Sequence, residues 1–73
     1  MFLKTLDGHY INSQFIYDVN IRSYDPYKTY TVYVCLVAGN ESTIHDIYKS
    51  DKKEDCEKYI EDTFVKKNKT ILG

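Results

Sequence analysis

The feature that most constrains the fold is a pair of alternating stretches that flank Asp25 and Pro26. The first reads FIYDVNIRSY (15–24) and the second reads TYTVYVCLV (29–37). Alternation of apolar and polar side chains is typical of half-buried β-strands, and the β-branched residues of the second stretch favour a strand further. Proline would break a helix here, whereas Asp-Pro is typical of a turn. The two stretches therefore predict an antiparallel β-hairpin.

The pairing register of this hairpin follows from the positions of its apolar side chains. A connection of two or four residues gives the same facing, and four is favoured because proline fits poorly late in a two-residue turn. In both registers one face collects the apolar residues Phe15, Tyr17, Val19, Ile21, Tyr30, Val32, Val34 and Leu36. A shift by one residue would turn one strand's set away from the core, so the register is well specified.

Tyrosines occur at every third position from Tyr24 to Tyr33, and this spacing divides them between the two faces of the hairpin. Successive side chains of a strand point to opposite faces. We therefore expect Tyr30 in the core and Tyr33 on the opposite face.

Two further tight turns extend the predicted sheet. Asp7-Gly8 lies between FLKTL and HYI, and this dipeptide favours a type I′ hairpin turn. Gly39-Asn40 offers another tight turn before STIHDIY, which reads as the third long strand.

The facing of this strand, over residues 42–48, stays open. A two-residue turn before it would place one pair of its residues inward and another pair outward. The inward pair would then be His45 and Ile47, and the outward pair Ile44 and Tyr48. A bulge near Glu41 would reverse both pairs.

The clearest helix is predicted over residues 51–67, and residues 68–73 form a short tail. Asp51 followed by Glu54 is typical of a capping box, and Ser50 is the alternative cap. Acidic residues lie in the first turns and lysines near the end, the order that the helix dipole favours. The apolar stripe recurs at helical spacing and comprises Cys56, Ile60 and Phe64, with Tyr59 and Thr63 beside it.

These elements predict an α+β fold in a single small domain of residues 1–73. An antiparallel β-meander of four to five strands spans about residues 2–48, and one C-terminal α-helix packs on one face. Because one helix covers only one face, Tyr33, Cys35 and Val37 would lie uncovered on the other. Two alternatives would cover them, namely curling of the sheet into a partial barrel or contact with another chain.

Charge and composition disfavour several classes of protein. The chain has 10 Lys and Arg against 11 Asp and Glu, so it lacks the basic excess that nucleic-acid phosphates attract. It has no apolar run of about 18 residues, which a membrane span needs, and its first residues lack the features of a signal peptide. We therefore expect a cytoplasmic protein in which Cys35 and Cys56 are reduced thiols.

No residue pattern indicates an enzyme, a cofactor or a metal site. The candidate ligands His9, Cys35, His45 and Cys56 show neither C-x-x-C nor H-x-x-x-H spacing. Cys35 and His45 could meet across adjacent strands, but nothing supplies an oxyanion hole or a deep pocket. We therefore expect a protein that has no catalytic residues, cofactor or bound metal.

Two surfaces remain as candidates for binding. The first is the uncovered sheet face, where the expected partner-binding residues are Tyr24, Tyr27, Tyr33, Cys35 and Val37. Its tyrosines could also stack the bases of single-stranded nucleic acid, although Arg22 and Lys28 stand almost alone as cations there. The second is the acidic helix face formed by Glu54, Glu57 and Glu61, which could imitate phosphates. Interleaved lysines make a solvated surface the simpler interpretation of that face.

The order of these segments resembles a class of known proteins. LDGHYIN, then FIYDVNI, then a strand rich in Tyr and Val, and finally CEKYIEDTF resemble small phage and mobile-element proteins of low-GC bacteria. In those proteins a β-meander precedes one C-terminal helix, and some inhibit host defence proteins such as CRISPR or restriction nucleases by binding them. The resemblance implies a non-enzymatic protein-binding module, whose partner is a host protein or a second copy. The alternative is a sheet that binds single-stranded nucleic acid through surface tyrosines.

Overall fold

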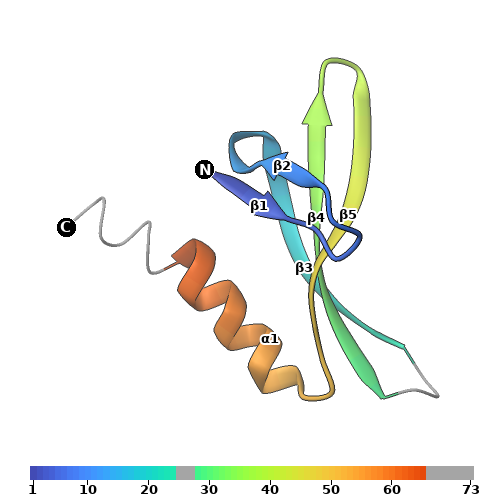
Figure 1. Ribbon diagram of the computed structural model, residues 1–73, viewed down its shortest axis with the longest axis vertical. Coiled ribbons are helices and arrows are strands. Elements are labelled where there is room, and N and C mark those ends of the chain that lie inside the picture. The colour runs from blue at the N-terminus through green and yellow to red at the C-terminus, as the bar shows by residue number, and fades with distance from the viewer. Residues whose placement is uncertain (25–27, 66–73) are drawn as a thin grey trace.

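The computed structural model describes residues 1–24 and 28–65 (Figure 1). The strands are β1 (Phe2–Lys4), β2 (Tyr10–Asn12), β3 (Ile16–Tyr24), β4 (Thr29–Ala38) and β5 (Glu41–Ser50). A 3₁₀ turn (Ser13–Phe15) links β2 to β3, and helix α1 (Lys53–Ile60) continues into a π-helical turn (Glu61–Val65). The predicted α+β class, with antiparallel strands and one C-terminal helix, is confirmed.

The five strands of the described residues form two sheets rather than one continuous meander. Strands β1 and β2 pair with each other, and β3, β4 and β5 form a separate antiparallel sheet in that order. The hairpin β1–β2 lies across the larger sheet (Figure 1). Its inward residues Leu3 and Ile11 pack into the same core as β4 and α1, so the hairpin and the helix share one layer.

The register of β3 and β4 is the predicted one over most of its length. Val19 pairs with Val34 and Ile21 with Val32, which brings the aliphatic side chains of both strands to the core face. The last pair joins Tyr24 to Thr29, so four residues connect the strands, as favoured by the sequence. The predicted turn at Asp25 and Pro26 itself lies outside the described residues.

The start of β3 differs from the prediction, which placed Phe15 and Tyr17 on the core face. A β-bulge between Ile16 and Asp18 leaves Tyr17 unpaired, and Ile16 instead pairs with Leu36 on the core side. Because an extra residue in one strand reverses the facing of what precedes it, Phe15 and Tyr17 are exposed.

Strand β5 also contains a bulge, at a position that the sequence did not indicate. The two-residue turn at Gly39-Asn40 pairs Ala38 with Glu41, so His45 lies opposite Val34 as in the first alternative. Between Asp46 and Tyr48 the register shifts, and Tyr48 lies opposite Val32. Ile47 is buried and Tyr48 packs against the core, so the first alternative holds as far as Ile47 and fails at Tyr48, because the bulge reverses the facing there.

The turn of the first hairpin is longer than the predicted two-residue type I′ turn. The Gly8 amide donates to the Thr5 carbonyl and the Thr5 amide donates to the His9 carbonyl, which leaves a three-residue loop. Within this loop only Gly8 has a positive φ, at 92°, whereas a type I′ turn needs two such residues. Within this three-residue loop the Asp7 side chain turns back and its carboxylate accepts a hydrogen bond from the Thr5 hydroxyl.

Helix α1 begins without the predicted capping box. Lys52 occupies the N-cap position with no side-chain cap, and no hydrogen bond joins Asp51 to Glu54. The Ser50 hydroxyl instead accepts from the Lys52 amide at 3.2 Å and donates to Asp55 at 2.9 Å. Neither Asp51 nor Ser50 is therefore the cap residue, and both sequence alternatives were wrong at this position.

The core lies between the three-stranded sheet and the layer of hairpin and helix. Val32, Val34 and Cys56 are fully buried, with exposed fractions of 0%. The partly buried residues that surround them include Tyr30 from β4, as predicted, and Tyr59, Ile60 and Phe64 from the helical segment. Burial raises the pKa of the Cys56 thiol, and its Sγ lies 3.5 Å from the Tyr30 carbonyl oxygen.

Candidate functional site

The side of β3–β4–β5 that faces away from the core is covered by no described element. Strand pairing places the side chains of Asp18, Asn20, Arg22, Thr31, Tyr33, Cys35, Val37, Ser42, Ile44 and Asp46 on this side. We call this surface the open face. It results from the alternation of side chains along three strands, of which only one face packs against the hairpin and helix.

One end of the open face is apolar. Tyr17 and Ile44 are each 60% exposed and Val37 is 45% exposed, while Cys35 is half-buried between them. The Tyr17 hydroxyl lies 2.9 Å from the Ser42 hydroxyl, so a side-chain hydrogen bond joins β3 to β5 on this face. We call Tyr17, Cys35, Val37 and Ile44 the open-face patch.

The other end of the open face contains an ion pair between Arg22 and Asp46. Arg22 donates from Nη2 to both carboxylate oxygens of Asp46, at 2.8 and 2.9 Å. Its guanidinium carbon lies 5.4 Å from the centre of the Tyr33 ring, within cation–π distance. Tyr33 is consequently half-buried, and one face of its ring is already occupied.

The structure brings together three of the five sequence-predicted binding residues: Tyr33, Cys35 and Val37 all lie on the open face. Tyr24 ends β3, but its side chain lies outside the described residues, as does the whole of Tyr27. Two patch residues were missed. Ile44 follows from the two-residue turn at Gly39-Asn40, whereas Tyr17 depends on a bulge that no sequence signal indicates.

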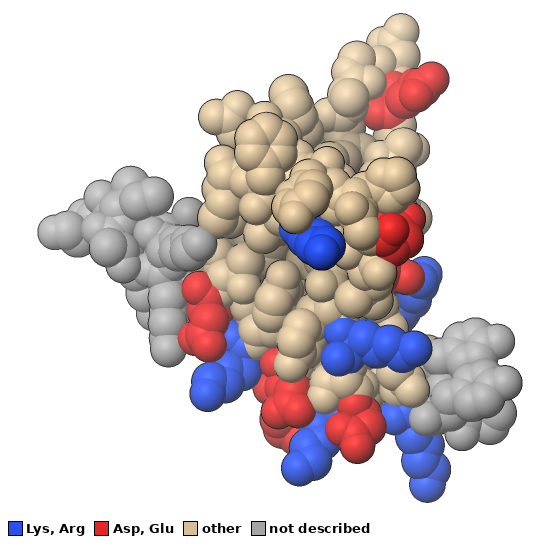
Figure 2. Space-filling model, viewed as in Figure 1, with Lys and Arg blue, Asp and Glu red and all other residues tan. Residues whose placement is uncertain are grey.

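The acidic helix residues Glu54, Glu57 and Glu61 are all exposed. Figure 2 shows that blue and red side chains gather together around the helix end of the molecule, whereas the part around the hairpin β1–β2 is largely uncharged. Charges of both signs at short spacing weaken any phosphate-like field. This arrangement favours a solvated helix surface.

Two hollows adjoin these surfaces. The larger, about 410 Å³, is an open groove between the first hairpin's turn and β5, lined by Leu6, Asp7, Arg22, Ile44, His45 and Asp46. The Leu6 amide donates to the Asp46 carbonyl at 2.9 Å and holds the turn there.

The smaller hollow, about 360 Å³, lies beside the stacked rings of Tyr48 and Tyr59, whose centres are 4.4 Å apart. Burial raises the pKa of the Tyr59 phenol.

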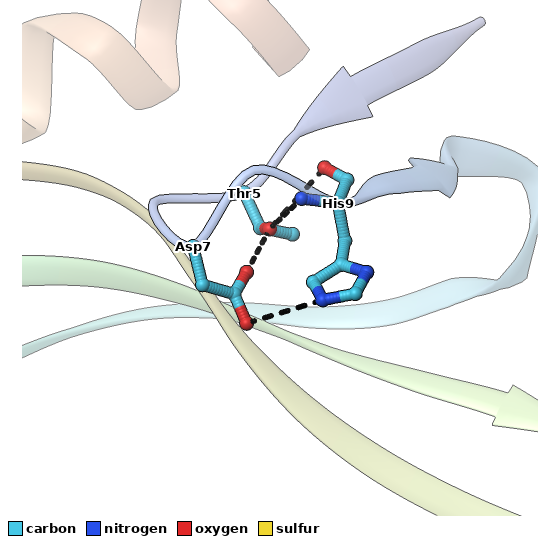
Figure 3. Close-up of polar contacts among 3 residues, drawn as sticks. All are labelled: Thr5, Asp7 and His9. Carbon is cyan, nitrogen blue, oxygen red and sulfur yellow. Dashed lines mark hydrogen bonds and ion pairs between the residues drawn. The ribbon is translucent and has the colours of Figure 1, made fainter.

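Figure 3 shows a compact polar cluster of Thr5, Asp7 and His9 at the turn of the first hairpin. The buried Thr5 hydroxyl accepts from the His9 amide at 2.9 Å and donates to the Asp7 carboxylate. That bond holds the pKa of the Asp7 carboxyl below its usual range. The His9 ring contacts Asp7 and not the hydroxyl, so the cluster lacks the base beside a nucleophile that acyl transfer requires. Its role is to close the turn.

Thr5→Val should cost about 1 to 2 kcal/mol of stability, because the His9 amide loses the acceptor of a part-buried hydrogen bond, the hydroxyl of the buried Thr5. Urea denaturation measures this change. The pKa of Asp7 should rise toward its usual value, as followed by NMR titration. Folding lowers the pKa of Asp7, so the hydrogen bond from Thr5 to the ionised Asp7 carboxylate stabilises the folded state at neutral pH. That contribution is lost only as the pH falls below about 4.

The control is Thr43→Val, which removes an exposed hydroxyl 3.0 Å from the His45 ring. We expect it to change the free energy of unfolding by less than about 0.5 kcal/mol. Equal effects of the two substitutions would contradict a specific role for the Thr5 hydroxyl.

The described residues contain no group of three or more His, Cys, Asp or Glu side chains placed to hold a metal ion. Within the same residues, no helix has the length and apolar character needed to cross a membrane. Comparisons with protein-family models, with curated proteins and with solved structures each gave no match to this chain.

Proposed function

We propose that the protein is a non-enzymatic protein-binding module that contacts its partner through the open-face patch. The observation that carries this proposal is the exposure of Tyr17, Val37 and Ile44 on one face of a three-stranded sheet that no described element covers. Contiguous exposed apolar surface is uncommon on soluble domains except where they bind other molecules.

The chemistry of the patch supports a protein as the partner. Aromatic and aliphatic side chains on a rigid sheet bury area at low entropic cost, and tyrosine is enriched at binding hot spots. The ion pair of Arg22 and Asp46 at its margin would serve as part of a polar rim. The half-buried Cys35 would add contact area at the centre of the patch.

The sequence resemblance suggests a narrower form of this proposal, in which the partner is a host defence protein such as a CRISPR or restriction nuclease. A small module that covers a functional surface of such an enzyme would inhibit it without chemistry of its own. We expect the purified protein to reduce cleavage by a susceptible nuclease in a dose-dependent manner.

Ile44→Asp tests the role of the patch. It places a charge on an apolar contact surface, so we expect inhibition or partner capture to weaken by at least about a hundredfold while the melting temperature changes little. The readouts are cleavage by the defence nuclease in the presence of purified protein, and affinity capture from lysate with and without nuclease treatment, followed by mass spectrometry.

Tyr10→Asp is the matched control, since Tyr10 is 67% exposed on β2 and lies away from the open face. It should leave binding unchanged. Equal capture of the same proteins by wild type and Ile44→Asp would overturn the proposed surface. Capture that disappears with nuclease treatment and falls steeply with salt would instead support the single-stranded nucleic-acid alternative.

A further inference from the structure

Strand β3 forms one edge of the three-stranded sheet, and among the described strands it pairs with β4 alone. The backbone hydrogen bonds found outside strands and helices in the described residues join the first hairpin to itself, Ser13 to Met1 and Leu6 to Asp46. None of them reaches the outer side of β3. An unpaired edge strand presents a row of amide and carbonyl groups that can bind another strand.

The charges of this edge strand are self-complementary. Asp18 and Arg22 carry opposite charges and both lie on the open face, because they pair with Cys35 and Thr31 of β4. Asn20 lies midway between them on the same face. On the core face, the intervening residues Val19 and Ile21 are both aliphatic and half-buried.

We propose that β3 pairs in antiparallel fashion with β3 of a second copy of this chain, about a twofold axis at Asn20. Asp18 of each copy then lies opposite Arg22 of the other, which forms two cross-strand ion pairs. Val19 of each copy lies opposite Ile21 of the other on the core face. Opposite charges and aliphatic pairs at directly facing positions both stabilise antiparallel strands.

The charges select this register over its neighbours. A twofold axis perpendicular to the sheet keeps both open faces on the same side, so the axis must pass between two identical residues. Centring it on Asp18 or on Arg22 would place like charges opposite each other, which destabilises pairing. Centring it on Val19 or Ile21 would place neither Asp18 nor Arg22 opposite a residue of opposite charge. Only an axis at Asn20 places Asp18 of each copy opposite Arg22 of the other.

The contacts that Arg22 and Asp18 make within one chain leave both side chains able to form the proposed ion pairs with the second copy. Arg22 uses only Nη2 for Asp46, so its other guanidinium nitrogens can donate to a second carboxylate. Asp18 accepts from the Asn20 side chain at 2.6 Å and has no ion pair with a described residue. The bulge at Tyr17 ends regular pairing just beyond Asp18, so the contact is short.

Such a dimer has a continuous sheet of six strands in which the two open faces lie on the same side. The inference is independent of the proposed function, because self-association is measured without the host partner. Sedimentation equilibrium should show a reversible shift from 8.6 kDa toward twice that mass at concentrations up to about 1 mM. A wild-type protein that stays monomeric over this range would overturn the proposal.

A charge exchange tests the register. In Asp18→Arg all charges at positions 18 and 22 are positive, and in Arg22→Asp all are negative. Each variant alone should dimerise at least about tenfold more weakly than wild type. An equimolar mixture of the two should form a heterodimer at least as tight as the wild-type dimer, because every facing pair is then complementary.

Two controls separate this pairing from general effects. Lys49→Glu changes an exposed charge on β5 and should leave dimerisation unchanged. Circular dichroism should show that both charge variants stay folded; if Arg22→Asp does not, Arg22→Gln should still weaken dimerisation while keeping the fold. Failure of the two charge variants to associate when mixed, with both folded, would refute the register.

Discussion

Val34→Asp should unfold the protein, whereas the same substitution at Val37 should leave it folded. Val34 is fully buried between the sheet and its covering layer, and Val37, three residues along the same strand, is on the open face. An isolated carboxylate in the core costs several kcal/mol, while a chain of this length has a free energy of unfolding of about 4 to 10 kcal/mol. The buried substitution therefore removes most or all of the stability.

Circular dichroism and thermal melting measure this difference. Val34→Asp should lack a cooperative transition, and Val37→Asp should melt within a few degrees of wild type because its carboxylate stays hydrated. The pair also controls for the low strand propensity of aspartate, which both variants share. Cooperative melting of Val34→Asp near the wild-type temperature would contradict the assignment of the two faces of β4.

Phe64→Ala should cost about 2 to 3 kcal/mol and lower the melting temperature by about 10 °C or more. Phe64 lies in the π-helical turn that follows α1 and packs against the core beside Ile60. The truncation removes an aromatic ring from a thin core and leaves a void that few neighbours can fill. Differential scanning calorimetry measures both the shift and the enthalpy.

Glu57→Ala is the control for this substitution, because Glu57 lies on the exposed side of the same helix. It should change the free energy of unfolding by less than about 0.5 kcal/mol. A Phe64→Ala protein that melts with the wild type would show that the π-helical turn contributes nothing to the core.

The alternating stretches predicted the central hairpin well, because a one-residue error would have exposed a whole apolar set. Val19, Ile21, Val32 and Val34 therefore meet on one face as expected. The helix was predictable for a similar reason, since Cys56, Ile60 and Phe64 recur every four residues and pack together on the core.

The sequence did not predict the two β-bulges. Around Tyr17 and around Ile47, apolar residues follow one another directly, in FIY and DIY, so alternation does not decide which neighbour turns inward. Packing against a separate layer decides it, and that layer contains a hairpin which the sequence placed in the main sheet. The open-face patch was therefore only half-predicted.

The ion pair over Tyr33 was missed because it depends on a diagonal contact across three strands. Arg22 and Asp46 are far apart in the chain and meet only after both hairpins have formed. The sequence predicted Tyr33 as one of the exposed contact residues of this face. In the structure its ring is partly covered, and Ile44 and Tyr17 present more exposed surface.

The bond from the Leu6 amide to the Asp46 carbonyl has a consequence for how the chain folds during synthesis. Among the described strands, β1 and β2 leave the ribosome before β5, yet the turn between them docks on β5. Its inward residues, Leu3 and Ile11, also pack on strands that emerge later. The hairpin β1–β2 therefore cannot make its native contacts until β5 has also left the ribosome.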